Sequence, residues 1–164
     1  MEKVIVIGCP GAGKSTFARK LATVTGLPLF YLDMIWHRAD RTTVSREEFD
    51  DALYAIMGGS SWILDGNYMR TLPDRLRFAD TVFFFDLPVD VCLAGAIDRL
   101  GKDREDMPWT DDVLDEEFRQ WILDFPQNQL PSMRESLNTF KGDVITFTTR
   151  EEADCYIEGL RTRK

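Results

Sequence analysis

The chain has 164 residues, of which 44% are hydrophobic and 29% are charged, the balance of one soluble globular domain. A domain of this length buries roughly two-thirds of its unfolded surface, so it needs neither a disulfide nor a structural metal to fold. The formal net charge of −8 at pH 7 disfavours phosphate backbones and no basic tract offsets it, so we expect no direct binding to nucleic acid.

The cysteines and the hydropathy pattern argue against zinc-binding, secreted and membrane-spanning proteins. Cys9, Cys92 and Cys155 lie far apart, without a CxxC pair or a histidine cluster, so we expect reduced thiols in a cytoplasmic protein and no zinc site. No apolar signal-peptide segment follows a basic start, and no apolar run approaches the roughly 18 residues of a membrane span. We therefore expect neither a signal peptide nor a transmembrane helix.

The first segments of the chain alternate between the sequence patterns of β-strands and of amphipathic helices. Residues 3–7 are apolar and largely β-branched, which predicts a strand. A glycine-rich turn follows, and then an amphipathic helix that we expect to stop at Gly26. Residues 29–32 predict a second strand, which ends at Asp33.

The middle of the chain continues this alternation. Ser45 and Glu48 form a capping-box pattern, which predicts the start of a helix that ends at Gly58. Residues 62–64 predict the third strand, which ends at Asp65. A helix should therefore connect the second strand to the third.

Two more strands follow in the second half. Residues 81–85 are apolar after the first position, as in a strand covered on both faces, and a helix should then reach about Leu100. Residues 144–147 predict the fifth strand. A second capping-box pattern, Thr149 with Glu152, starts the last helix.

No strand pattern is found between about residues 101 and 140. We expect a helix around 113–125 that is broken by Pro126, and a second helix after Pro131. We interpret the stretch as a helical insertion before the last strand. The whole pattern predicts an α/β domain of three layers, with a parallel five-stranded sheet between helices.

The strongest motif lies between the first strand and the first helix. It matches G-x-x-x-x-G-K-[ST], the phosphate-binding loop (P-loop), and consists of Gly8, Cys9, Pro10, Gly11, Ala12, Gly13, Lys14, Ser15 and Thr16. The glycines let the backbone turn its N–H groups toward phosphate oxygens, and the following helix adds its positive dipole. Lys14 would contact the β- and γ-phosphates, and Ser15 would bind Mg²⁺. The motif predicts binding of a nucleoside triphosphate, ATP, with Mg²⁺.

Three carboxylates follow directly after expected strands: Asp33, Asp65 and Asp86. The carboxyl ends of parallel strands share one edge with the P-loop, so we expect these acids near the bound phosphates. Asp33 is a candidate catalytic and acceptor-binding residue, and Asp65 is a candidate ligand of Mg²⁺ or of its waters. An Asp after a strand can also cap a helix or a turn, and for Asp86 both interpretations stay open.

Several arginines are candidates for contacts with phosphate or acceptor. Arg99 and Arg104 lie in a polar turn after the fourth strand's helix, where they could screen charge on a transferring phosphoryl group. A solvated charged turn is the alternative. Arg70, shortly after Asp65, could hold an anionic or nucleotide acceptor, and a surface arginine is its alternative.

The aromatic residues of the insertion and the single histidine of the chain indicate less specific roles. We expect an apolar stripe to belong to the core rather than to a ligand surface; its members are Trp109, Phe118, Trp121, Ile122 and Phe125. His37 has no partner in the sequence, and we expect it to pack in a loop.

Most of the chain resembles the adenylate-kinase-like branch of small P-loop kinases, and most closely the bacterial DNA topology modulation proteins. The matching segments are residues 4–16, 31–33, 62–70, 83–88 and 98–102. The resemblance implies the strand order 2-3-1-4-5. It also places Asp65 near magnesium and Arg70 near the acceptor, although the run between them is one residue longer than in adenylate kinases. Arg99 would begin a lid that is much shorter than theirs.

These observations predict one P-loop kinase-like domain over residues 1–164, with an acceptor-side segment at about 34–60 and a short lid-like segment at about 99–112. The expected activity is ATP-dependent phosphoryl transfer to a small nucleotide-, nucleoside- or polyol-like acceptor. The expected catalytic residues are Lys14, Asp33, Arg99 and Arg104. The alternative is a regulatory switch that binds ATP and hydrolyses it slowly. The sequence leaves the acceptor and the oligomeric state open.

Overall fold

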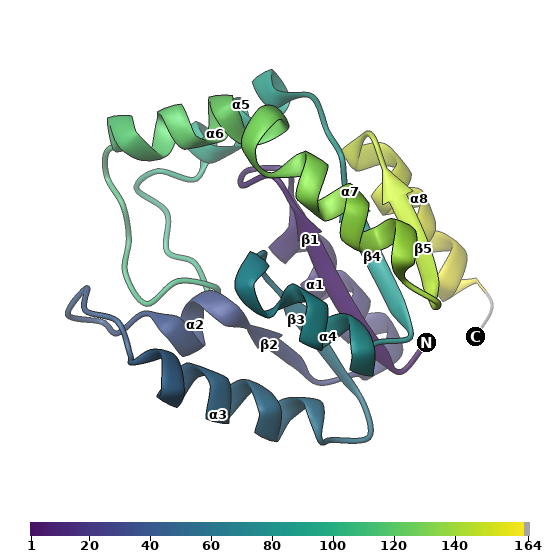
Figure 1. Ribbon diagram of the computed structural model, residues 1–164. Helices are drawn as coiled ribbons and strands as arrows, with labels where there is room; N and C mark the ends of the chain where they lie inside the picture. Colours follow the sequence, from purple (N-terminus) through teal and green to yellow (C-terminus); the bar gives the residue numbers. More distant parts are fainter. Residues whose placement is uncertain (163–164) are drawn as a thin grey trace.

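A five-stranded parallel sheet forms the centre of the computed structural model, which describes residues 1–162 (Figure 1). Its strand order is β2-β3-β1-β4-β5, which confirms the expected order. The strands are β1 (Lys3–Gly8), β2 (Leu29–Tyr31), β3 (Trp62–Asp65), β4 (Thr81–Phe85) and β5 (Asp143–Phe147).

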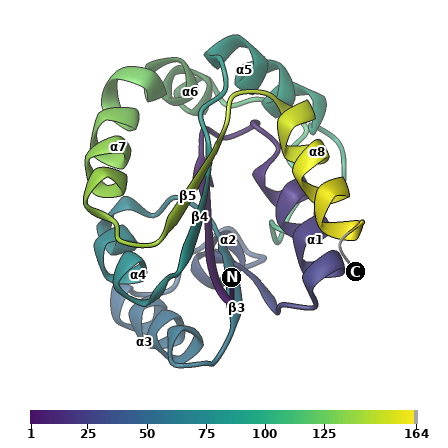
Figure 2. The same ribbon diagram turned by 90° about the vertical axis from the view of Figure 1, so that its right-hand side faces the viewer.

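Helices cover both faces of the sheet, so the predicted three-layer arrangement is confirmed. The α-helices are α1 (Lys14–Thr25), α2 (Leu32–Trp36), α3 (Arg46–Met57), α4 (Leu72–Phe78), α5 (Val89–Asp98), α6 (Glu116–Asn128), α7 (Leu130–Thr139) and α8 (Arg150–Arg161), with the 3-10 turn η1 at Met69–Thr71. Figure 2 shows α1 and α8 on one face of the sheet and α3, α4 and α7 on the other. No helix in the described part of the chain is long and apolar enough to cross a membrane.

The central strands are buried on both faces. Every residue of β3 and β4 is buried, and so is all of β1 after its first residue, which explains their continuous apolar runs. Phe17 fixes α1 on the sheet, because its ring centroid lies 4.7 Å from that of Phe83 and 5.3 Å from that of Phe147. Since α1 begins at Lys14, this packing also holds the end of the P-loop in place.

Both capping boxes form as predicted. In α3 the Glu48 amide donates to Ser45 Oγ at 3.1 Å, and the Ser45 amide donates to Glu48 Oε2 at 2.8 Å. Thr149 and Glu152 make the same pair of contacts at the start of α8. Each box satisfies backbone donors that have no partner within the helix.

The structure corrects two element boundaries on the acceptor side. β2 ends at Tyr31, and Leu32 starts the short helix α2, so Asp33 lies in the first turn of a helix and not directly after a strand. Between β3 and β4 the sequence interpretation omitted η1 and α4, whose few residues show little helical periodicity.

The insertion before β5 is helical, as expected, but its boundaries differ. α6 begins at Glu116 with Asp115 as its cap, and it continues through Pro126 to Asn128. Pro126 sits in the last turn, where the loss of one hydrogen bond does not end the helix. Pro131 is in the first turn of α7. A backbone N–H in that turn has no partner within the helix, so proline costs no hydrogen bond there.

A long loop, residues 99–115, joins α5 to α6. Figure 1 shows it descending from α5 toward α2 and returning to α6. Trp109 packs edge-on against His37 with ring centroids 5.0 Å apart, and Arg41 Nη1 lies 3.9 Å from Asp111 Oδ1. These contacts bring the loop against the segment after α2, so that it faces the carboxyl edge of the sheet.

Candidate functional site

The P-loop connects β1 to α1 in the conformation that its glycines allow. Gly13, the residue before α1, has a φ of 105°, in the left-handed region that favours glycine. A Cβ on Gly11 would collide with the Cys92 carbonyl oxygen of α5, so the loop approaches that helix too closely for any other residue. The loop therefore ends with free backbone N–H groups at the start of a helix, the arrangement that binds phosphate.

Two side chains from distant segments hold the loop in place. Asn67, just after β3, accepts from the Gly8 amide at 3.0 Å and donates to the Gly8 carbonyl at 2.9 Å. Arg150, the first residue of α8, donates to the carbonyls of Gly11 at 2.7 Å and Ala12 at 3.3 Å. Sequence reasoning assigned neither residue a role, although Asn67 lies inside a segment that carried the resemblance.

Lys14 projects from the start of α1 into the site. Its Nζ donates to the Cys9 carbonyl at 2.9 Å. Burial lowers the pKa of Lys14, and the nearby carboxylate of Asp65 opposes that shift. The ammonium group is thus held by one carbonyl and one acid at the point where bound phosphates would add negative charge.

Asp65, at the end of β3, is 5% exposed. Burial raises its pKa to about 6, although the Lys14 charge and a hydrogen bond from Ser15 act in the opposite direction. Its Oδ1 atom has no hydrogen-bond partner among the described residues. A buried carboxylate oxygen without a partner is costly, so it is suited to bind a group that arrives with the substrate.

Asp33 is positioned by a tyrosine from the loop after β3. Tyr68 Oη donates to Asp33 Oδ1 at 2.7 Å, and burial together with the Asp33 charge raises the pKa of Tyr68. Among residues 1–162, Tyr68 provides the one hydrogen bond to the Asp33 side chain, so a carboxylate oxygen of Asp33 stays available for another ligand.

Arg75 of α4 fixes the loop that carries Tyr68. Its guanidinium is buried and donates to the carbonyls of Gly66 at 2.9 Å and Tyr68 at 3.1 Å, and it also contacts the Asn67 carbonyl. Burial lowers the pKa of Arg75 to about 9. The sequence interpretation missed this residue, because a charged residue in a short helix normally faces solvent.

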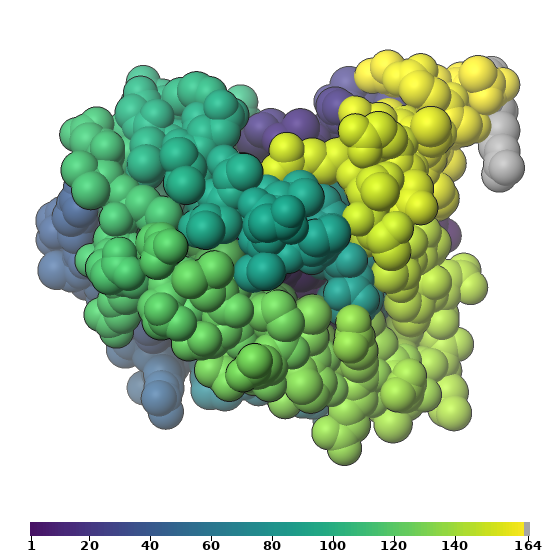
Figure 3. All heavy atoms as spheres, turned by 90° about the horizontal axis from the view of Figure 1, so that it is seen from above, coloured from purple at the N-terminus to yellow at the C-terminus, as the bar shows by residue number. Residues whose placement is uncertain are grey.

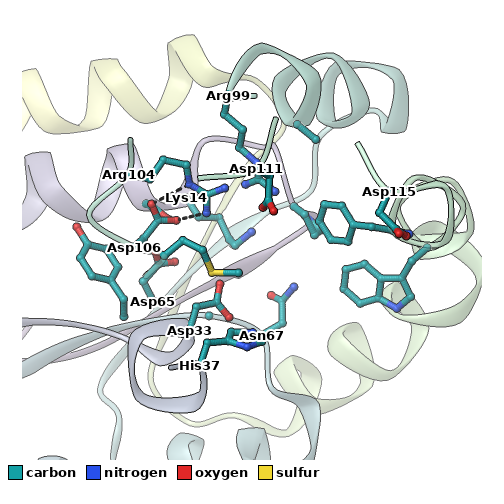
Figure 4. A pocket seen from close by; sticks show the side chains of 18 of the residues that line it. Lys14, Asp33, His37, Asp65, Asn67, Arg99, Arg104, Asp106, Asp111 and Asp115 are labelled. Atoms are coloured by element: carbon teal, nitrogen blue, oxygen red, sulfur yellow. Dashed lines mark hydrogen bonds and ion pairs between the residues drawn. The ribbon is translucent and has the colours of Figure 1, made fainter. Parts of the chain in front are cut away.

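The 99–115 loop adds an ion pair beside the P-loop. Arg104 Nη2 lies 2.8 Å from Asp106 Oδ2 (Figure 4). The same oxygen accepts from Ser15 Oγ at 3.1 Å. Asp106 is only 8% exposed. Burial would raise its pKa, but the hydrogen bonds from Arg104 and Ser15 outweigh this effect and the pKa of Asp106 is lowered.

Two adjoining cavities meet at these residues. The larger, of about 540 Å³, contains Asp33, Asp65 and the loop after β3. The smaller, of about 440 Å³, lies between the start of α1, the end of α5 and α8. Seen from above, purple atoms of the first part of the chain show between the teal atoms around α5 and the yellow atoms of α8 (Figure 3). The residues that line both cavities are Lys14, Ser15, Arg99, Arg104 and Asp106.

Two candidates lie outside both cavities. Arg70 forms a two-pronged contact with Asp50 of α3, at 3.0 and 2.6 Å, because η1 directs it toward that helix. Asp86 pairs with Arg134 of α7 at 2.7 Å, so the expectation that all three strand-end acids gather at the site is wrong for Asp86.

The aromatic stripe divides between core and cavity. Ile122 and Phe125 are buried, as expected. Phe118 and Trp121 instead line the larger cavity, and Trp109 lies outside α6 against His37. Helical periodicity identifies a shared face but does not distinguish a core from a cavity wall.

The comparisons with known proteins show the fold. No family model and no curated protein matches the chain. A shikimate kinase from Acinetobacter baumannii, solved with shikimate, is 18% identical with a TM-score of 0.62, over all of this chain and 95% of that one. A shikimate kinase from Bacteroides thetaiotaomicron is 14% identical with a TM-score of 0.58, over 97% and 96%. A gluconokinase from Sinorhizobium meliloti is 14% identical with a TM-score of 0.53, over 99% and 92%.

The site fits a magnesium ion that arrives with a nucleotide. Within residues 1–162 no group of three or more histidine, cysteine or acidic side chains could hold a metal ion by itself. Mg²⁺ does not need such a group, because it is usually bound by one or two protein ligands, waters and substrate phosphates. The unpartnered Oδ1 of Asp65 and the Ser15 hydroxyl are oxygen atoms of the kind that this mode uses.

Proposed function

We propose that this chain transfers the γ-phosphoryl group of ATP, with Mg²⁺, to a hydroxyl group of a small molecule. One observation carries the proposal: a cavity beside the P-loop and a second, separate cavity share a wall of Lys14, Ser15, Arg99, Arg104 and Asp106. A kinase requires this arrangement, since donor and acceptor must meet at one phosphorus atom while their remaining parts stay apart.

The smaller cavity is assigned to the donor. P-loop amides and the Lys14 ammonium would bind the β- and γ-phosphates, and Arg99 and Arg104 would face the charge on the transferring group. Ser15 and Asp65 would hold Mg²⁺, which neutralises phosphate charge when bound. Catalysis of this kind depends on positioned charges rather than on a covalent intermediate.

The larger cavity is assigned to the acceptor. The acceptor oxygen forms a bond to the γ-phosphorus, the bond to the bridging oxygen breaks, and ADP leaves while the hydroxyl proton is released. Asp33, held by Tyr68, is the proposed group that orients the hydroxyl or accepts its proton. Arg70 is not carried forward as an acceptor ligand, since it contacts Asp50 outside the cavity.

Structural neighbours support this reaction class. Two of them are named for shikimate and one for gluconate, so folds of this kind hold small hydroxylated acceptors. Nucleotides, nucleosides and polyols remain proposed acceptors here. The resemblance to DNA topology modulation proteins stays a prediction based on sequence motifs, as does the cytoplasmic location, which rests on the three unpaired cysteines.

An acceptor screen tests the proposal. Protein with Mg²⁺ and ATP is incubated with nucleosides, nucleotides, polyols, hydroxy acids and amino alcohols, while ADP release and phosphoester formation by ³¹P NMR are followed. Lys14→Ala should lower transfer about a hundredfold, and Lys141→Ala, an exposed lysine, should not. ADP release without any phosphorylated product would instead indicate the slow ATP-hydrolysing switch.

A further inference from the structure

We propose that the acceptor of this site carries a positive charge, as an organic ammonium group on an apolar or aromatic body that also bears the reacting hydroxyl. The inference deepens the proposed function and rests on it. It follows from the balance of charges around the larger cavity, from the position of the remaining arginines, and from the cavity's aromatic wall.

The charge balance of the larger cavity is negative. Its carboxylates are Asp33, Asp65, Asp106, Asp111 and Asp115, and its lysine and arginine residues are Lys14, Arg99 and Arg104. Lys14 and Arg99 also line the donor cavity, where bound phosphates would engage them. Asp106 is paired with Arg104, and Asp65 is the proposed ligand of Mg²⁺. Once phosphates engage Lys14 and Arg99, the acids that keep no cationic partner inside the acceptor cavity are therefore Asp33, Asp111 and Asp115.

In the free protein the charge of Arg99 acts on Asp33 and Asp111, and the charge of Lys14 acts on Asp33. Once donor phosphates engage these two cations, the remaining contacts of the three acids leave most of their charge uncompensated. Asp33 accepts from the Tyr68 hydroxyl, and Asp115 accepts from the Phe118 amide at 3.0 Å. Asp111 accepts from Trp109 Nε1 at 2.9 Å, and within residues 1–162 it pairs with Arg41, whose Nη1 lies 3.9 Å away, between two exposed side chains. Neutral donors orient a carboxylate without removing its charge, and an exposed pair at this distance is weak.

Asp65 adds a buried acceptor atom to the same cavity. Its Oδ1 is without a partner in the described chain, although the residue is almost completely buried. Figure 4 shows Asp33, Asp65, Asp111 and Asp115 from different segments around one space. With Asp65 engaged by Mg²⁺, a ligand that brings donors and positive charge would satisfy Asp33, Asp111 and Asp115, whereas a ligand that brings a carboxylate would add to the repulsion.

The arginines that could receive an anionic acceptor are engaged elsewhere. Arg70 is bound to Asp50, and Arg75 is buried against three carbonyls of the loop after β3. Arg38 lies 3.5 Å from Glu48. None of these three side chains lines the acceptor cavity. A carboxylate acceptor would thus find only Arg99 and Lys14, which the donor phosphates also require.

The far wall of the cavity is apolar and aromatic. Phe118 and Trp121 stack at 6.1 Å between ring centroids and line the cavity together with Val113, which is 78% exposed. Aromatic faces next to carboxylates attract organic cations through both cation–π and charge interactions. The Arg99 guanidinium already lies over Phe118, with its Cζ 5.8 Å from the ring centroid, so this wall accepts a cation. Trp121 and Val113 offer the remaining apolar surface for the body of the acceptor, and the acids account for its charge.

The test compares three probes with one skeleton: 2-amino-1-phenylethanol, 1-phenylethane-1,2-diol and mandelate, which are cationic, neutral and anionic. Binding to the full chain is measured by calorimetry, with Mg²⁺ and a non-hydrolysable ATP analogue bound. We expect the amine to bind at least about tenfold more tightly than mandelate, with the diol between them. The preference should shrink as salt is raised, because charge interactions at an open cavity are screened.

Variants that each remove one negative charge show which acids cause the preference for the amine. Asp111→Asn keeps an acceptor for Trp109, and Asp115→Asn keeps a good helix cap, so both should fold. Each should weaken amine binding by about threefold to fivefold and leave diol binding unchanged. Asp112→Asn removes the same charge from an exposed neighbour that does not line the cavity, and it should change neither affinity.

The outcomes separate this inference from the proposed function. Mandelate binding as tightly as the amine, or no amine binding up to about 10 mM, would overturn the cationic acceptor. If mandelate or another hydroxy acid is also phosphorylated, the proposed kinase function holds and only the cationic acceptor is rejected. If the amine binds with the expected charge preference and no probe or screened acceptor is ever phosphorylated, the cationic site stands and the kinase function fails.

Discussion

Ser15 and Asp106 are 91 residues apart in the sequence, yet the Ser15 hydroxyl donates to the Asp106 carboxylate at 3.1 Å. The contact joins the P-loop to the 99–115 loop, and the Arg104 ion pair forms on the same carboxylate. In this conformation the hydroxyl proposed to bind Mg²⁺ is engaged by a carboxylate. Binding of the nucleotide must therefore rearrange this contact.

The first prediction concerns that carboxylate. Asp106→Asn removes the partner of Arg104, so the guanidinium loses its fixed position at the junction of the cavities. We expect phosphoryl transfer to fall by about 10- to 100-fold. The melting temperature should fall as well, because a largely buried Arg104 loses its partner, so transfer is measured well below it. Single-turnover kinetics measure the effect. Glu105→Gln, an exposed acid of the same loop, is the matched control, and equal loss in both variants would contradict a specific role.

A second prediction concerns Asp33. Asp33→Asn keeps the shape of the side chain but loses the charge and the base, so transfer should fall by a factor of about 10² or more while ATP affinity stays the same. Tyr68→Phe removes only the hydroxyl that holds Asp33, and it should cost less. Acceptor-dependent ADP release and ATP calorimetry separate the two effects. Full activity of Asp33→Asn would make Asp65 the better candidate.

The third prediction concerns stability and pH. Burial raises the pKa of Asp65 to about 6 from its ordinary value of 3.8, so the folded state binds more protons than the unfolded state between these values. The free energy of unfolding contributed by this group therefore falls as pH rises from about 4 to 6 and stays low above pH 6. Asp65→Asn should stabilise the free protein by about 1–3 kcal/mol at pH 7.5 and by less at pH 4.5.

Urea denaturation at both pH values measures this difference. The same variant should lose phosphoryl transfer, since the amide replaces the proposed magnesium ligand. A variant that is destabilised equally at pH 4.5 and pH 7.5 would show that the Asp65 charge is favourable in the free protein, for example because Lys14 compensates it fully.

The fourth prediction concerns the buried guanidinium of α4. Arg75→Met should leave the carbonyls of Gly66, Asn67 and Tyr68 without their donor and destabilise the protein by about 3 kcal/mol. Thermal denaturation measures the loss, and exposed Arg77→Met in the same helix is the control. Because the loop also carries Tyr68, transfer should fall even below the melting temperature. Wild-type stability of Arg75→Met would contradict this role.

Patterns of neighbouring residues in the sequence were sufficient to predict the donor half of the site. The P-loop, the strands on either side of β1 and both capping boxes depend on neighbouring residues, and each is found where the sequence predicts it. The position of Asp65 as the last residue of β3 could be predicted for the same reason, because an apolar run identifies a buried strand and hence its end.

The acceptor half depends on contacts between distant segments. Asp106 and Asp111 lie on a loop without periodicity, and its position is set by contacts such as Trp109 against His37. Phe118 has the same helical spacing as core residues, so only the structure shows that it faces a cavity. These assignments required knowledge of which surfaces the loop and α6 would meet.

The contact of Arg150 with the P-loop has a consequence for biosynthesis. This arginine follows Gly11 by 139 residues and supplies two donors to the loop's carbonyls. A nascent chain could form β1 and α1 early, but the loop would lack this support until the start of α8 had left the ribosome. Nucleotide present during translation would therefore favour folding intermediates in which the start of α8 has reached the P-loop over earlier ones.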